Sequence, residues 1–372
     1  MYFRLIALLL MLGIGIARQG VRAEPIPGLS TVFIIVMENH DWSTIKGSAF
    51  CPYINNTLLP QAAYANAYYN PAGIHPSEPN YLWLVGGTNF GVKDDKLPSI
   101  NTQRTTNHLA WLLDRAGVPW KAYVEDITGR NIPLTNNGPY VARHVPFLFF
   151  ENINTNLTYV TNHIRPYGEL ARDLTSNTVP NFCFITPNLT NDMHNTTAGS
   201  PSSRLQGDNW LAKEIPLILK SAAYQRGGLV IITWDEGAGS SSDGPIGLIL
   251  LSPRVRSAGF NSSVPYDHSD TLRTLQDILG VRPYLGAAAN ATGLGEFFKF
   301  LRVEAAGVDE AGRHFTLRDA VAGRTYRLEF SLDARPSSWT GVTEQIATAA
   351  TLEFVDSSPE SSHQFFRVRE LP

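Results

Sequence analysis

Basic residues are scarce in this sequence of 372 residues. It has 30 Lys and Arg against 33 Asp and Glu, which gives a formal net charge of −3. Removing residues 1–23, a predicted signal peptide, takes away three arginines and no acid, so the charge becomes −6. Proteins that bind nucleic acid need clustered Lys and Arg to contact the phosphate backbone. We therefore expect no nucleic-acid partner.

Cysteine is scarce as well. The chain has only Cys51 and Cys183, which allows one disulfide at most. In an oxidising compartment the two could form that bridge. Equally, each could be a small buried residue, because the residues around Cys183, Phe182 to Ile185, are typical of a core strand. Both alternatives stay open at this point.

Long apolar runs are absent except near the start of the chain. A run from Leu5 to Ala17 follows Arg4, and Val21-Arg22-Ala23 fits the small-x-small pattern before a signal peptidase cut. The run is shorter than the roughly 20 residues that span a bilayer. We predict that residues 1–23 are a signal peptide, that no stable membrane anchor remains after cleavage, and that the mature protein is soluble and secreted or periplasmic.

Apolar residues make up 43% of the chain, enough for a large core. Most of them lie before residue 300, where the pattern changes. Beyond it, three segments alternate apolar and polar residues, which indicates a small antiparallel β module: Tyr326–Leu332, Thr351–Val355 and Phe365–Arg369. We predict one large domain over residues 24–299 and an accessory β domain over residues 300–372.

Four short apolar runs within the large domain are continuous rather than alternating. Such runs indicate strands covered on both faces, as in a parallel sheet. They cover residues 31–37, 181–185, 229–233 and 246–251. Helical patterns lie between them, over residues 106–116, 208–223 and 269–279. The alternation predicts an α/β fold with a mostly parallel sheet sandwiched by helices.

Two segments of this domain carry more detailed predictions. The helix over residues 208–223 opens with Asp208, which is suited to the N-cap, and Pro216 should kink or split it. The long irregular stretch from residue 129 to residue 162 is expected to form part of a pocket rim.

Polar residues follow each of the four apolar runs directly. They are Glu38-Asn39-His40, Thr186-Pro187-Asn188, Asp235-Glu236 and Ser252-Pro253. In open α/β folds, ligands bind beyond the carboxyl ends of the strands. We therefore expect these polar residues to meet at one edge of the sheet and to contain the functional site.

The acids among them favour a divalent cation. Glu38 and Asn39 offer hard oxygen donors, suited to Mg²⁺, Ca²⁺ or Mn²⁺ and usable by Zn²⁺. Asp235 and Glu236 could both reach a cation if the chain turns at Gly237. The alternatives are that Asn39 caps a helix while Glu38 faces solvent, and that Asp235 and Glu236 form a polar turn. However, three acids at one edge would repel one another without a cation.

Ser77 is predicted to start a helix, with Pro79 in the first turn, where proline is tolerated. It could simply be the N-cap. A hydroxyl at a helix N-terminus also lies in a positive field beside free backbone N–H groups, which stabilise an alkoxide and a bound phosphate. Metal coordination is one way to activate such a serine as a nucleophile.

Three histidines are candidates for the same site. His194 follows a strand together with Asp192, His268 precedes a helix, and His144 lies beside an aromatic cluster. Neutral imidazole can bind metal, and imidazolium can bind phosphate oxygens or protonate a leaving group. Five other histidines are expected to be capping or surface residues: His40, His108, His163, His314 and His363.

Six short segments between about residues 31 and 280 match a known family in order. They are Val36 to His40, Pro76 to Tyr81, Arg143 to Phe147, Pro187 to His194, Thr233 to Gly237 and Asp267 to Thr274. On these segments the chain resembles the bacterial secreted phosphoesterases that include acid phosphatases and phospholipases C, in the alkaline-phosphatase-like superfamily. Residues 300–372 lie outside the match and resemble a carboxy-terminal β module of bacterial secreted enzymes.

The resemblance implies roles for individual residues. One divalent cation would be bound by four ligands, with Ser77 completing the site and acting as nucleophile: Glu38, Asn39, Asp235 and Glu236. A histidine, His194 or His268, would protonate the leaving group. Asn80, His144 and Asp192 would contact the phosphate or the leaving group.

The resemblance also implies an activity. It is the metal-dependent hydrolysis of phosphate monoesters through a phosphoserine, acting on a phosphorylated small molecule or a lipid headgroup. The residues after Asn39, His40-Asp41-Trp42-Ser43, depart from the Arg-Ser-Phe-Asp-like run of the phospholipase C branch. They are closer to short acid phosphatases and to lipid-phosphate phosphatases. The alternatives are cleavage of lipid phosphodiesters and a non-catalytic secreted binding protein. The metal and the oligomeric state stay open.

Overall fold

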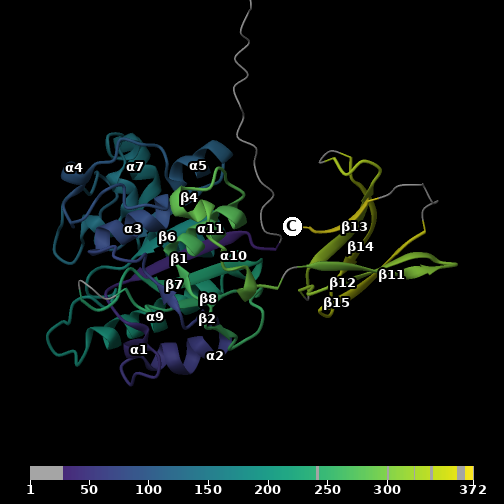
Figure 1. Cartoon of the computed structure of the whole chain (residues 1–372), viewed down its shortest axis with the longest axis horizontal. Helices are drawn as coiled ribbons and strands as arrows, with labels where there is room; N and C mark the ends of the chain where they lie inside the picture. The colour runs from purple at the N-terminus through teal and green to yellow at the C-terminus, as the bar shows by residue number, and fades with distance from the viewer. Residues whose placement is uncertain are drawn as a thin grey trace, which may run out of the picture.

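A computed structural model describes most of the chain: residues 28–239, 243–299, 301–321, 323–335, 338–357 and 365–371. The predicted signal peptide lies outside these residues. Within them, no helix is long and apolar enough to cross a membrane. Figure 1 shows an α/β part built around a large sheet and a smaller part built of strands alone.

The large sheet has eight strands in the order β5-β4-β6-β1-β7-β8-β2-β9. In that order they are Ile164–Pro166, Trp120–Val124, Phe182–Thr186, Thr31–Met37, Gly228–Trp234, Leu248–Leu251, Ala63–Ala65 and Asn261–Ser262. The first five are parallel to one another. β1 and β7 are buried along their whole length, which explains why their sequences are continuous apolar runs. The predicted mostly parallel sheet is confirmed.

The direction of one strand contradicts the prediction. β8 is antiparallel to β7, so Ser252 lies at the edge of the sheet opposite to Asp235. The prediction that Ser252-Pro253 belongs to the functional edge is therefore wrong. If β8 were parallel to β7, the chain between them would have to cross over the sheet, which takes a dozen or more residues and usually a helix. No helix lies between β7 and β8 in the described part of that connection.

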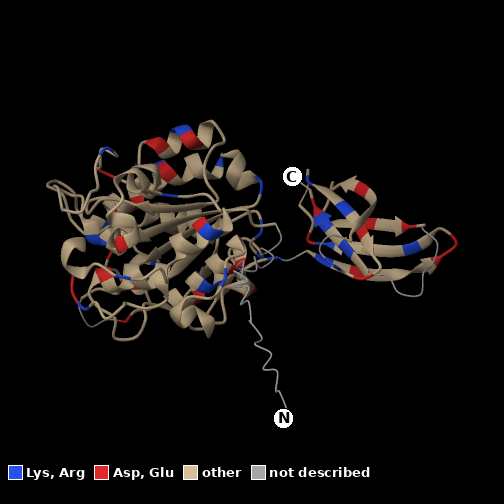
Figure 2. Cartoon of the chain, turned by 90° about the horizontal axis from the view of Figure 1, so that it is seen from above, with Lys and Arg blue, Asp and Glu red and all other residues tan. Residues whose placement is uncertain are grey.

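Helices cover both faces of the sheet (Figure 2). α3 packs against both α5 and α11, and α9 packs against α8 and α10. The α-helices α1 to α11 are Trp42–Ile45, Leu59–Gln61, Ser77–Gly86, Pro98–Asn101, Leu109–Ala116, Glu151–Asn154, Leu157–His163, Glu169–Thr175, Ser203–Leu219, Ala222–Gln225 and His268–Leu279. A two-stranded sheet joins β3 (Tyr68–Tyr69) to β10 (Tyr266–Asp267). Single turns of other helix types are η1 to η5: Ile54–Leu58, Ala142–His144, Pro146–Phe149, Gly286–Ala289 and Gly295–Phe297.

The helix predicted over residues 208–223 is α9, and it begins five residues earlier. Its N-cap is Ser202, whose hydroxyl accepts a hydrogen bond from Arg204 N. Asp208 is therefore not a cap but a buried residue within the helix, where its carboxylate accepts from two backbone N–H groups of another segment, Tyr53 and Ile54. Pro216 does not split α9, which runs unbroken through it and ends one turn later, at Leu219.

The C-terminal strands form two three-stranded antiparallel sheets, β11-β12-β15 and β14-β13-β16. Strands β11 to β16 are Arg302–Asp309, Gly312–Arg318, Thr325–Ser331, Thr340–Ile346, Thr351–Asp356 and Phe365–Glu370. They have their own hydrophobic cluster, which includes Leu317, Tyr326, Leu328 and Phe354. The predicted antiparallel module is confirmed, and its boundary at residue 300 stays a prediction.

Both cysteines are free and buried. Cys183 lies in β6, at the centre of the sheet, whereas Cys51 lies at the start of the segment that leads into η1. Burial raises the pKa of both thiols, that of Cys51 to about 12. The structure thus agrees with the second alternative, in which each cysteine is a small core residue.

His108 is the N-cap of α5, as expected of a capping histidine. Its Nδ1 accepts from Trp111 N at 3.3 Å and its Nε2 donates to Asn152 Oδ1 at 3.1 Å, while the ring stacks on Phe150. Burial lowers the pKa of His108 from 6.5 to about 4. The folded state therefore keeps the ring neutral at pH values at which the unfolded chain takes up a proton.

Acid should destabilise the fold through His108. The stabilisation is present above pH 6.5 and is lost as the pH falls toward 4, by roughly 2 to 3 kcal/mol at pH 4.5. His108→Asn keeps an acceptor at the N-cap but cannot titrate. Urea unfolding at pH 7 and pH 4.5 should show a loss of stability that is smaller in the variant by that amount. Equal losses in the two proteins would contradict this role.

Candidate active site

Glu38 is the first residue after β1 and is fully buried. Its Oε2 accepts a hydrogen bond from Ser77 Oγ at 3.0 Å, and its Oε1 accepts from the Tyr81 hydroxyl at 2.8 Å. The alternative in which Glu38 faces solvent is therefore wrong. Asn39 does not cap the next helix either, because the N-cap of α1 is Asp41.

Asn39 and Asp235 are brought together by the pairing of two strands. β1 and β7 are parallel and in register to their last residues, Met37 and Trp234. Asn39 N donates to Asp235 Oδ1 at 3.0 Å. Asn39 has a φ of +51°, a left-handed conformation that asparagine tolerates better than most residues. The two polar segments thus meet at the carboxyl edge of the sheet, as the sequence predicts.

Ser77 is the first residue of α3, which confirms the predicted helix start. The N-cap is Pro76, so the alternative that Ser77 is itself the cap is wrong. Its hydroxyl donates to Glu38 Oε2 and so joins the start of α3 to the end of β1. A nucleophilic hydroxyl at this position lies between buried acids and the positive end of a ten-residue helix.

The three acids of the cluster have raised pKa values. Burial, and then the charges of Asp235 and Asp192, hold the pKa of Glu38 well above its ordinary range. Burial raises the pKa of Asp235 to about 6. Burial, followed by the charges of Asp235 and Asp95, raises the pKa of Glu236 to about 9. Burial and the mutual repulsion of the acids thus outweigh the positive charge of Arg143, which acts to lower the pKa of Glu38.

Several buried oxygens of the cluster also lack a hydrogen-bond donor. Among the described residues, no partner reaches Asn39 Oδ1, Asn80 Oδ1, Asp192 Oδ2 or Asp235 Oδ2. Buried polar atoms are rarely left unpaired. Unpaired oxygens beside acids with raised pKa values are the arrangement that a divalent cation would satisfy. The residues present thus fit a hard cation.

His144 lies against Glu38. Its Nε2 is 3.1 Å from Glu38 Oε1 and its Nδ1 is 3.4 Å from Asp192 Oδ2, although neither contact has the angles of a hydrogen bond. The ring stacks on Tyr81 with centroids 4.8 Å apart. Burial holds the pKa of His144 well below its ordinary value, so the ring is neutral. Glu38, His144 and Asp192 form a buried group whose ligand atoms lie within 4.8 Å of one another and could also hold a metal ion.

The two histidines predicted to protonate the leaving group differ in environment. His194 is exposed; its backbone N donates to Asp192 Oδ1 at 2.8 Å. His268 is buried, and its ring nitrogens are 2.7 Å from Asp235 O and 3.0 Å from the Tyr68 hydroxyl. Burial lowers the pKa of His268 to about 4. The His268 ring thus lies behind Asp235 with both nitrogens in contact, whereas the His194 ring lies at the surface with its Nδ1 2.8 Å from Asn195 Oδ1.

His75 is a site residue that the sequence analysis did not identify. Its Nδ1 is 2.5 Å from Glu236 Oε2, and its Nε2 is 3.0 Å from Asp243 Oδ1. Asn80 Nδ2 also donates to Glu236 Oε2 at 3.3 Å. The only signal in the sequence was its position two residues before Ser77. Tyr81, which donates to Glu38, was missed in the same segment.

Replacing His75 by glutamine should weaken cation binding. His75 orients Glu236, and the loss of a residue that orients a metal ligand lowers metal affinity by about 10-fold to 100-fold. Calorimetric titration of the metal-free protein with Mn²⁺ measures the change. His163→Gln is the control, since His163 contacts Trp120 O in another part of the fold. Wild-type affinity in His75→Gln would contradict the positioning role.

The sequence is similar to those of known proteins. A model described as the Phosphoesterase family matches residues 52–282, more than half of the chain. A protein of Mycobacterium tuberculosis named phosphatidylinositol-3-phosphatase is 32% identical over 276 residues, 74% of this chain and 85% of that protein. A probable acid phosphatase of Kluyveromyces lactis is 29% identical over 253 residues, 66% of this chain and 56% of that protein.

A solved structure shares the fold. It is a protein in the alkaline phosphatase superfamily from Vibrio parahaemolyticus, with a TM-score of 0.51 and 11% sequence identity. The match covers 83% of this chain and 80% of that one. At this identity the similarity shows the architecture alone, and it confirms the alkaline-phosphatase-like fold that the sequence resemblance implies.

Proposed function

This chain belongs to the Phosphoesterase family and is a phosphoric ester hydrolase, and from this we propose that it hydrolyses phosphate monoesters through a phosphoserine formed on Ser77. The observation that carries the proposal is the position of the Ser77 hydroxyl. It is 3.0 Å from Glu38 and at the N-terminus of α3, where backbone N–H groups favour a phosphate. Acids alone would repel an anionic substrate, so the proposal includes a cation.

The cation would be held by oxygen ligands at the ends of β1 and β7, with Ser77 beside them. The four ligands are Glu38, Asn39, Asp235 and Glu236. The unpaired oxygens of Asn39 and Asp235 and the raised pKa values of the acids support this set. When bound, a divalent cation would favour the ionised serine and offset negative charge on the phosphoryl oxygens. Oxygen ligation suits Mg²⁺, Ca²⁺ or Mn²⁺, and Zn²⁺ can also use it.

The reaction has two steps in this proposal. Ser77 Oγ attacks the phosphorus atom in line with the leaving oxygen, so the Oγ–P bond forms while the ester P–O bond breaks. His194 gives a proton to the leaving oxygen, a contribution of about 10²-fold to 10⁴-fold for a positioned acid. Water then attacks the phosphoserine, which releases inorganic phosphate and restores the hydroxyl. Glu38 accepts the hydrogen bond of Ser77 and so orients Oγ before attack.

Monoesters are the substrates that the relatives support. The proteins from M. tuberculosis and K. lactis both have names that describe phosphatases. Phosphorylated small molecules and lipid headgroups both present such a monoester. The competing activity is the cleavage of lipid phosphodiesters, and the experiment has to distinguish it from monoester hydrolysis.

The test is an activity panel with the purified protein. We expect hydrolysis of p-nitrophenyl phosphate and little release from phosphatidylcholine. A chelator should abolish the hydrolysis, and one of Mg²⁺, Ca²⁺, Mn²⁺ or Zn²⁺ should restore it. Preference for the diester would overturn the monoester assignment, and full activity in chelator would overturn the cation. No hydrolysis of either substrate with any ion would overturn the proposed function.

A further inference from the structure

A second concave surface lies beside the candidate active site. The segment of residues 126–140, which follows β4, encloses a cavity of about 450 Å³. The sequence predicts part of a pocket rim in residues 129–162, and this segment overlaps that stretch. Polar groups of this segment that line the cavity are Asp126, Thr128, Arg130, Asn131, Thr135 and Asn137.

The segment that lines the cavity begins at the same edge of the sheet as Glu38. β4, β6 and β1 are adjacent and parallel, so their carboxyl ends point the same way (Figure 1). Neighbouring strands are about 4.8 Å apart, which places the end of β4 roughly 10 Å from the end of β1. A substrate with its phosphate at Ser77 can therefore extend its leaving group toward the cavity.

Two short connections join the cavity wall to the active-site residues. Asp126 accepts a hydrogen bond from Asn188 Nδ2 at 2.7 Å, and Asn188 O accepts from Asp192 N at 2.9 Å. On the other side, Asn136 Oδ1 accepts from Ala142 N at 2.9 Å, at the start of the turn that ends with His144. The wall and the site are thus parts of one hydrogen-bonded edge.

The lining has the chemistry of a polyol site. Arg130 and Asn131 are exposed at the lining, and Asn131 Oδ1 accepts from Thr128 Oγ1 at 3.2 Å, which leaves the Asn131 amide nitrogen and the Arg130 guanidinium able to donate to a ligand. The lining has no net charge, because it contains one arginine, Arg130, and one aspartate, Asp126. It therefore does not attract a second phosphate group of the substrate. Amides, hydroxyls and a balanced charge pair can donate to and accept from sugar hydroxyls.

We propose that this cavity binds the leaving group of the substrate, and that this group is a polyol such as a hexose or an inositol ring. The inference rests on the proposed function, because the phosphate of the same molecule would lie at Ser77. Arg130 and Asn131 determine specificity for the polyol. Asn136 supports the turn that carries His144 and is left unchanged in the tests below.

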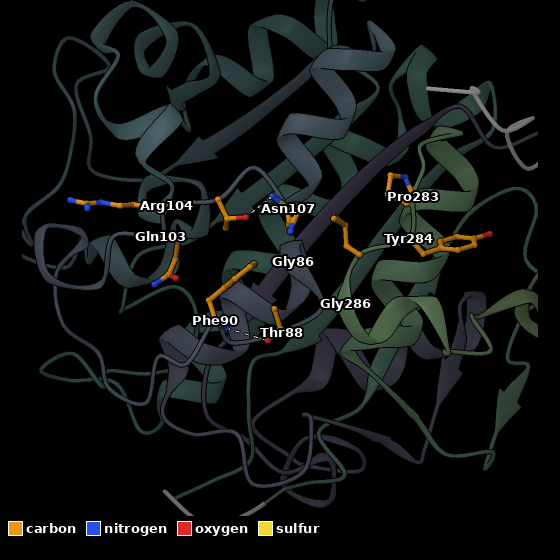
Figure 3. Close-up of a pocket in the computed structure, with 11 residues that line it drawn as sticks. Gly86, Thr88, Phe90, Gln103, Arg104, Asn107, Pro283, Tyr284 and Gly286 are labelled. Carbon is orange, nitrogen blue, oxygen red and sulfur yellow. Dashed lines mark hydrogen bonds between the residues drawn. The ribbon is translucent and has the colours of Figure 1, made fainter. Parts of the chain in front are cut away.

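A larger cavity elsewhere supplies the matched control. It has a volume of about 570 Å³ and is lined by Gly86, Phe90, Gln103, Arg104 and Tyr284 (Figure 3). It lies at the C-terminal end of α3, nine residues from Ser77, which is about 14 Å along a helix. Arg104 is exposed there and its Nε is 3.2 Å from Glu151. Arg104→Gln therefore makes the same chemical change as Arg130→Gln in a cavity away from the substrate.

The first experiment compares substrates with and without a polyol. Kinetics are measured on glucose 6-phosphate, inositol monophosphate and p-nitrophenyl phosphate. In Arg130→Gln combined with Asn131→Ala, we expect kcat/KM for the polyol phosphates to fall about 10-fold to 100-fold further than for the nitrophenyl ester. Arg104→Gln should change none of them. Equal losses on all three substrates, or no loss on either polyol phosphate, would overturn the proposal.

The second experiment separates this inference from the proposed function. Ser77→Ala is titrated calorimetrically with inositol monophosphate and with inorganic phosphate in the presence of Mn²⁺. Adding the Arg130 and Asn131 changes should weaken binding of inositol monophosphate at least 10-fold and leave phosphate binding unaltered. This result would support the polyol site even if the wild type proved inactive. Equal affinities for inositol monophosphate with and without the two changes would overturn it even if the enzyme proved active.

Discussion

Ser77→Ala is expected to lower kcat/KM for p-nitrophenyl phosphate by about 10⁴-fold or more, because the attacking atom is removed. No phosphate should remain on the protein after acid quenching of a reaction with labelled substrate, whereas the wild type should show it. Cation affinity should stay close to that of the wild type. The four proposed oxygen ligands remain, and Glu38 keeps its hydrogen bond from Tyr81.

The control for Ser77→Ala is Ser221→Ala. Ser221 is another buried serine at a helix start, the N-cap of α10, where its hydroxyl accepts from Tyr224 N at 3.1 Å. Its replacement should cost about 1 kcal/mol of stability and leave kcat unchanged. If Ser77→Ala turned over the nitrophenyl ester at the wild-type rate, or still became phosphorylated, Ser77 would not be the nucleophile.

Asp235→Asn is expected to remove cation binding and to lower kcat about 10³-fold, since the site would lose several kcal/mol of charge stabilisation. In the absence of metal, however, Asp235→Asn should stabilise the fold. Burial raises the pKa of Asp235 to about 6, so the ionised carboxylate destabilises the metal-free fold at pH 7. A neutral amide removes this cost, and the metal-free variant should unfold at a higher urea concentration than the metal-free wild type.

Added metal should reverse the order when it is in large excess. The raised pKa of Asp235 corresponds to a cost of about 3 kcal/mol at pH 7, whereas a cation at 1,000 times its Kd stabilises a protein by about 4 kcal/mol, and only the wild type should gain this. Asp208→Asn is the matched control, because Asp208 is also a buried acid but accepts from two backbone N–H groups outside the site. Its replacement should change stability by the same amount with and without metal and keep the gain on metal addition. A gain for Asp235→Asn equal to that of the wild type would exclude Asp235 as a ligand.

The central strands could be predicted because burial on both faces leaves a simple pattern. β1, β6 and β7 are continuous apolar runs, and their predicted bounds lie within one residue of those observed. β4 carries Lys121, and β2 has only three residues, so neither gave a comparable run. The direction of β8 could not be inferred, because an apolar run does not specify which way the strand points.

The candidate site was predictable where it depends on strand ends. Glu38 and Asp235 meet because the strands before them are neighbours and parallel. Contacts made by connecting segments were not predictable. His268 seemed suited to proton transfer from sequence, but Tyr68, 200 residues away, and the Asp235 carbonyl occupy its ring nitrogens. His75 reaches Glu236 across 161 residues in the same way.

The two buried thiols make the folded chain inert toward thiol reagents. Only a thiolate reacts, and burial both hides the sulfur atoms and raises their pKa. A thiol reagent can therefore label each cysteine only after the fold around it has opened. Cys183 lies in a central strand and Cys51 near the peripheral helices, so the two labelling rates would time separate openings of one molecule. The labelling rate of Cys183 would thus report the unfolding of the sheet, and that of Cys51 would report the unfolding of the outer layer.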